Sequence, residues 1–161
     1  MTTAARELLK DANIALQMLE EEDNADRWRV IWFAAISMTR SIGHVLHKVD
    51  SEDNQALKIA SRTAFDEWKS LPEHKIFNQF IEIERNSLIK ENITNAEGYT
   101  DVWGIVFTDP NGIEHIESIE ATLYKPIMNG PYQGDDARGV LSEALEWWAA
   151  ELDKLDLVTA A

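Results

Sequence analysis

The 161-residue chain contains no cysteine. Disulfide bonds, thiolate catalysis and cysteine-ligated metals are therefore excluded. No apolar run is long enough to cross a membrane, and the first residues lack the basic-then-apolar order of a secretory signal peptide. These features predict a cytoplasmic protein without a membrane partner.

Basic residues are scarce as well, with 15 Lys and Arg against 29 Asp and Glu, for a net charge of −14. A charge of this sign opposes approach to nucleic acid or to an anionic membrane. It favours a basic protein partner, although a local basic patch could still bind a phosphate.

The length fits one domain over residues 1–161, and 45% hydrophobic residues are enough for a core. The six tryptophans indicate a core, a groove or an interface rich in large rings. Neither an internal repeat nor a low-complexity segment interrupts the chain.

Hydrophobic periodicity predicts a mainly α fold, an antiparallel bundle of about five helices with a small β-hairpin insertion between the last two. The spacing places the helices at about 3–22, 25–49, 52–70, 72–91 and 136–157. Polar residues suited to cap helix starts are Asn24 or Asp26, Asp50 or Ser51, the capping box Ser70 to Glu73, and Asp135 or Asp136.

Residues 92–134 form the predicted hairpin and loop insertion. The segment 103–107 is strand-like, and Asp109-Pro110-Asn111-Gly112 is typical of a β-turn. The isoleucines that follow recur every three residues, which fits a simple strand poorly. A bulge or an irregular second arm is therefore expected.

The most pointed chemical feature is Arg85-Asn86, followed by Lys90, in the helix predicted over 72–91. Guanidinium donors bind phosphate in a bidentate manner, and a neighbouring amide can orient them. The alternative is that Arg85 pairs with Glu82 or Glu84 on a solvated helix face.

This segment resembles the HEPN superfamily, whose hallmark is an Arg, then Asn, Asp or His, then a His one turn later on one helix. The long helix over 25–49 with its Trp-rich face and the terminal helix with Ala144-Leu-Glu-Trp-Trp148 extend the resemblance. HEPN members are small helical bundles. Many are metal-independent ribonucleases, and others bind nucleotides or proteins.

The resemblance implies a protein of bacterial stress, defence or toxin–antitoxin type, with Arg85, Asn86 and Lys90 at the catalytic positions. It also implies a homodimer, because HEPN members often form their groove across two subunits. Lys90 stands where the His is expected. Since a lysine stays protonated at neutral pH unless burial removes its charge, we expect binding of nucleotide or RNA phosphate with weak or no cleavage.

A second set of candidate binding residues lies in the helix predicted over 25–49. His44 and His47 are three residues apart and share a face, and with Arg40 and Ser41 they could line a groove opposite Arg85. The alternative is an exposed polar stripe. The sequence lacks the His-Glu-x-x-His and Glu-x-x-His patterns of metal sites, and neither a metal nor a cofactor is predicted.

Two other functions stay open from the sequence. The acidic surface could make the chain a non-enzymatic, antitoxin-like or inhibitor-like module that binds a basic protein. Alternatively, Trp28, Trp32 and Trp148 could line a small-molecule pocket. Of the pair Trp147-Trp148, one ring is expected in the core and the other against the hairpin or a second subunit.

Overall fold

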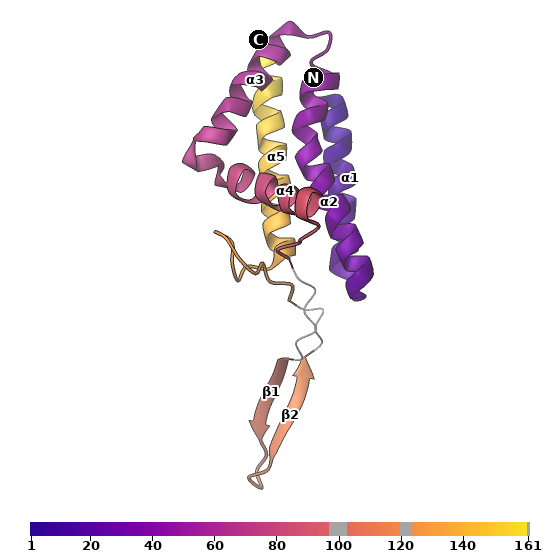
Figure 1. Cartoon of the computed structure of the whole chain (residues 1–161), viewed down its shortest axis with the longest axis vertical. Helices are drawn as coiled ribbons and strands as arrows, with labels where there is room; N and C mark the ends of the chain where they lie inside the picture. The colour runs from indigo at the N-terminus through magenta and orange to yellow at the C-terminus, as the bar shows by residue number, and fades with distance from the viewer. Residues whose placement is uncertain (97–102, 120–123, 161) are drawn as a thin grey trace.

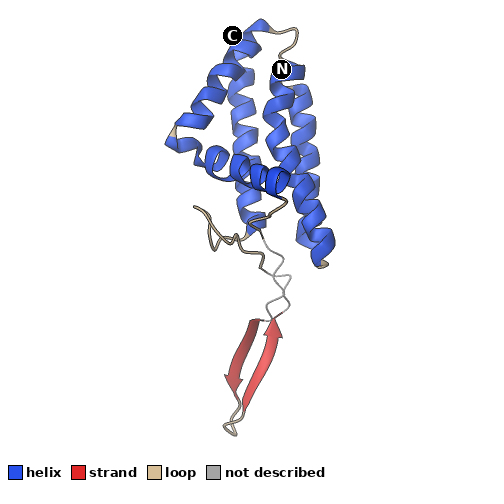
Figure 2. Ribbon diagram, viewed as in Figure 1, coloured by secondary structure: helices blue, strands red, loops and turns tan. Residues whose placement is uncertain are grey.

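The computed structural model describes residues 1–96, 103–119 and 124–160. It is mainly α-helical, with a two-stranded antiparallel sheet between the last two long helices, as the periodicity predicted (Figures 1 and 2). The helices are α1 (Thr3–Glu21), α2 (Ala25–Val45), α3 (Gln55–Ser70), α4 (Glu82–Glu91) and α5 (Ala137–Ala160), and the strands are β1 (Trp103–Thr108) and β2 (Glu114–Ile119). A π-helical turn, η1 (Leu46–Asp50), follows α2, and another, η3 (Phe77–Ile81), precedes α4.

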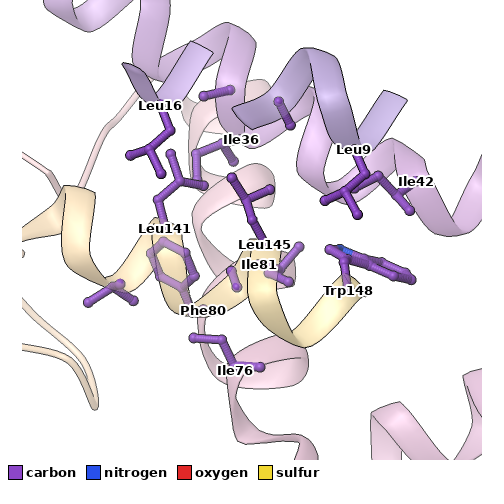
Figure 3. Close-up of a cluster of buried hydrophobic side chains, with 14 of the residues drawn as sticks. Leu9, Leu16, Ile36, Ile42, Ile76, Phe80, Ile81, Leu141, Leu145 and Trp148 are labelled. Carbon is purple, nitrogen blue, oxygen red and sulfur yellow. The ribbon is translucent and has the colours of Figure 1, made fainter. Parts of the chain in front are cut away.

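The core lies between α1, α2 and α5, with η3 and α4 packed across them (Figures 1 and 3). In α1 the buried residues recur at helical spacing, so one stripe faces the other helices. Leu9 and Leu16 of this stripe approach Leu141 and Trp148 of α5 in one cluster (Figure 3). Hydrophobic burial along these seams holds the helices in the bundle. None of the helices in the described ranges is long and apolar enough to cross a membrane.

Helix starts are set by polar side chains, but two predicted assignments are wrong. The Asn24 side chain caps α2 and accepts the backbone N–H of Arg27, as expected. The cap of α3 is Asn54 and not Asp50 or Ser51. Asp50 instead accepts the N–H groups of the second and third residues of α1, at 2.8 and 2.9 Å, because the end of η1 lies beside that helix start.

The segment leading into α4 also departs from the prediction. A 3-10 turn at Pro72–His74 follows Leu71, and the Ser70 hydroxyl donates to the carbonyl of Asp66. The side chain of Ser70 is therefore used by the preceding helix, and the predicted capping box with Glu73 does not form. The π turn η3 then widens the helix by one residue per turn and leads directly into α4.

The paired tryptophans of α5 take different positions. Trp148 is fully buried. Trp147 is half-buried and packs on Trp68 and Phe77, with ring centroids 5.3 and 5.5 Å apart, and its indole N–H donates to His74. The expectation that this ring faces the hairpin is wrong, because the segment between α3 and α4 packs on it, and contact with a second subunit stays a prediction.

The hairpin is regular, which corrects the expected bulge. Six consecutive pairs run from Trp103 with Ile119 to Thr108 with Glu114. The turn forms as predicted, with Asp109 accepting two backbone N–H groups and Gly112 at φ 82°. Apolar side chains are exposed on both faces of the hairpin. Because neither face packs on a core, the strand does not need alternating polar and apolar residues, and isoleucines at every third position fit a regular strand.

Candidate functional site

Arg85 lies on α4 and is half-buried. Its Nη1 donates to Oδ1 of Asn86 at 2.9 Å, so the amide fixes the direction of the guanidinium. Neither Glu82 nor Glu84 pairs with Arg85, which corrects the alternative interpretation. Among the described residues Arg85 makes no ion pair, and its remaining donors are available to an anion.

The carboxylate of Glu84 does not pair with Arg85 because it belongs to a hydrogen-bond network on the other side. The carboxylate is 3% exposed and accepts the indole N–H of Trp32 at 2.9 Å, the hydroxyl of Thr94 at 3.1 Å, and both the backbone and side-chain N–H of Asn95. These bonds fix α4 against α2 and hold the chain after α4. The hydrogen bonds of Glu84 therefore fix the rotation of α4 about its axis, and with it the direction in which the adjacent Arg85 projects.

Arg40 on α2, and not Arg85, pairs with the carboxylate of Glu82. Its Nη2 lies 3.3 Å from Oε1 of Glu82, and its guanidinium stands over the rings of Phe65 and Phe77 at 5.9 and 5.5 Å from their centroids. Burial lowers the pKa of Arg40, and the positive charge of Arg85 lowers it further, while Glu82 opposes both effects. Arg85 thus lies near enough to Arg40 for their charges to interact, and Glu82 pairs with Arg40 but not with Arg85.

A groove of about 490 Å³ opens beside Arg40, between the second half of α2 with η1 and the helix α3. This volume lies in the range of small-ligand sites. Its lining comes from three elements: Arg40, Gly43 and His44 of α2, Leu46 and His47 of η1, and Ser61, Arg62, Phe65, Asp66 and Trp68 of α3.

The groove brings together three of the four residues predicted as a binding set. Arg40, His44 and His47 all line it, because the π turn η1 continues α2 without a break and keeps the histidines near α3. Ser41 is exposed and is not part of the lining. Lys90 is also exposed and lies one turn beyond Asn86, outside the groove.

The charge in this region opposes that of the whole chain. Arg40 and Arg62 line the groove together with one acidic residue, Asp66. The local balance is positive by one charge before the histidines are counted, against −14 for the chain. A site that holds excess positive charge in an acidic protein is suited to an anion.

Sequence reasoning missed the contribution of α3. Ser61, Arg62 and Asp66 carry no motif, and their relation to the histidines depends on how α3 packs against α2. Glu82 was considered as a partner of Arg85, but its pairing with Arg40 on another helix has no local signal. The spacing of Phe65 and Trp68 along α3 was the available indication that the helix faces the bundle.

The predicted pocket between tryptophans is filled by the rings themselves. Trp28 and Trp32 stack with centroids 5.3 Å apart and an interplanar angle of 12°, and both are buried, as is Trp148. Within the described ranges, groups of three or more His, Asp or Glu that could hold a metal ion are absent.

Comparisons of the chain with protein-family models, with curated proteins and with solved structures find no match. The functional argument therefore rests on the residues and their geometry.

Proposed function

We propose that the cluster of Arg40 and Arg85, with the adjoining groove between α2 and α3, binds the phosphate of a nucleotide or of RNA. The observation that carries this proposal is the guanidinium of Arg85, which makes no ion pair within the described residues, is oriented by Asn86 at 2.9 Å and lies near a second arginine. Glu82 offsets one of these two positive charges, so a bound anion would neutralise the other. A phosphate offers several acceptor oxygens to both guanidinium groups.

The groove next to the cluster supplies room for the rest of such a ligand. Phe65 and Trp68 give it apolar walls, while Ser61 and the two histidines add hydrogen-bonding groups. A planar base or a sugar fits walls of this composition. The proposal keeps the HEPN-like interpretation of the Arg85-Asn86 pair and its bacterial stress, defence or toxin–antitoxin setting.

Binding without efficient cleavage is proposed because of the residue at position 90. Lys90 is exposed and carries a strongly hydrated charge, so it is poorly suited to accept a proton from a ribose hydroxyl. Its place, one turn beyond Asn86, favours an electrostatic contact with a passing phosphate chain. The homodimer and a basic protein partner stay predictions of the sequence.

The test is the affinity for a fluorescein-labelled single-stranded RNA of about ten nucleotides, measured by anisotropy at low salt. Replacing Arg85 with Ala should weaken binding roughly tenfold or more, because a charge-assisted contact contributes about 1.5–3 kcal/mol. The control is Arg27→Ala, which removes the same charge from an exposed pair with Glu22 and should change affinity less than twofold. Equal losses in both variants would contradict a localised site.

A further inference from the structure

The hairpin of β1 and β2 leaves an unusual amount of apolar surface uncovered. Ile116 is 76% exposed and Val106 57%, and they face each other across the ladder. Phe107 on the opposite face is also exposed. Figure 1 shows the two strands beyond the end of the helical bundle, not against it. A two-stranded hairpin of this kind is marginally stable in water and gains stability when further strands extend it.

The backbone of β2 presents open hydrogen-bonding groups along its outer edge. The N–H of Asp109 donates to the carbonyl of Ile113 at 2.9 Å, which marks a bonded pair at the turn. Bonded and non-bonded pairs alternate along an antiparallel ladder, so the Val106 and Ile116 pair is non-bonded. The N–H and carbonyl of Ile116 therefore point away from β1, as do those of Glu114 and Ser118.

We propose that this edge pairs with the same edge of a second copy of the chain, antiparallel, with Ile116 on the twofold axis. The result is a four-stranded sheet in the order β1, β2, β2 and β1. The proposal does not depend on the phosphate site, since its residues belong to separate elements.

Avoidance of like-charge pairs, together with the self-complementary apolar row, selects the second copy and the register. With Ile116 on the axis, His115 of each chain lies opposite Glu117 of the other, and Glu114 lies opposite Ser118. The imidazole of His115, whose Nε2 lies 3.2 Å from Oδ2 of Asp109 in its own chain, places no negative charge opposite Glu117, whereas like charges directly opposite are destabilising. Moving the register two residues toward the end of β2 would place Glu117 opposite Glu117. Moving it the other way would place His115 opposite His115 and bring Glu114 against Ile116.

The same register joins the exposed apolar side chains of one face. Val106 and Ile116 of one copy meet Ile116 and Val106 of the other in one row across the sheet. The twofold arrangement makes the strand edge self-complementary, as a closed dimer requires. It also covers the β2 edges, which would otherwise be templates for uncontrolled strand pairing.

The absence of natural cysteine allows a direct crosslinking test in the full-length chain. Under mild oxidation, Ile116→Cys should form a disulfide-linked dimer, because residues opposite each other on neighbouring strands have Cα atoms about 5.5 Å apart. The matched control is Val106→Cys, on the same face. In the proposed sheet the two copies of this residue lie three strand spacings apart, about 14 Å, and should stay unlinked.

Sedimentation equilibrium of Ile116→Lys provides the second measurement. The variant should raise the dimer dissociation constant roughly tenfold or more, with unchanged helical circular dichroism, since residue 116 lies outside the core. Crosslinking through position 106 and not 116 would overturn the proposal in favour of the β1 edge. A monomeric wild-type chain, or a dimer that Ile116→Lys leaves intact, would also overturn it. RNA binding by all three variants should equal that of the wild type.

Discussion

The buried carboxylate of Glu84 should be among the largest single contributions to the stability of the bundle. It accepts four hydrogen bonds from three residues, and Glu84→Ala would remove the acceptor of the buried Trp32 indole and of the partly buried Asn95 donors. Each bond to a charged group contributes about 1.5–3 kcal/mol, but such effects do not add fully. We expect a loss of about 3–5 kcal/mol in the free energy of unfolding, measured by urea denaturation.

A reciprocal exchange tests the network more sharply than the deletion. Asn95→Asp places a carboxylate where the Asn95 amide donates at 2.9 Å to Glu84, and should cost at least about 2 kcal/mol by repulsion. Adding Glu84→Gln returns a donor to the pair, so the double variant should recover about 1–3 kcal/mol relative to the sum of the single changes. Glu91→Gln, exposed at the end of the same helix, should stay within about 0.5 kcal/mol. Strict additivity of Asn95→Asp and Glu84→Gln would refute the reasoning.

Three further predictions follow from other parts of the chain. A Cβ on Gly43 would lie 2.9 Å from the buried Trp148 ring, so Gly43→Ala should lower the free energy of unfolding, measured in urea, by about 1–3 kcal/mol. A Cβ on Gly139 would meet no described atom within 4 Å, so Gly139→Ala should be neutral or stabilising. Burial raises the pKa of Tyr132 to about 12 from 10.0, and its hydroxyl has no hydrogen-bond partner in the part of the chain that the structure describes. The unfolded chain therefore ionises first, so wild-type stability should fall relative to Tyr132→Phe as pH rises from 10 towards 12. Lys90→His should increase cleavage of a labelled single-stranded RNA if the rest of the site is intact, and unchanged cleavage would show that position 90 does not reach the ligand.

Much of the fold was predictable because its signals are local. The stripe of α1 and the Asn24 cap of α2 lie within a few residues of what they determine, and so does the turn at 109–112. The role of Asp50 was not predictable in this way. Its partners at the start of α1 are 45 and 46 residues away, and the side chain is available because η1 ends beside that helix.

In the candidate site, too, the local features were predictable from the sequence and the contacts between helices were not. His44 and His47 were expected in a groove with Arg40 because helical spacing places them on one face. The pairing of Arg40 with Glu82 depends on how α4 crosses α2, and the network of Glu84 depends on the loop that follows α4. Sequence periodicity carries no information on how α4 crosses α2 or on the course of that loop, so it could not show that Arg85 makes no ion pair with a described residue.

The central claim is that Arg40 and Arg85 bind one phosphate together. The most direct measurement is a double-mutant cycle with Arg40→Gln and Arg85→Gln, using the anisotropy of the labelled RNA at fixed low salt. If both arginines contact one phosphate, each single variant should weaken binding roughly tenfold or more, and the double variant should lose less than the product of the two effects. Wild-type affinity in either single variant, or fully independent effects, would contradict the claim.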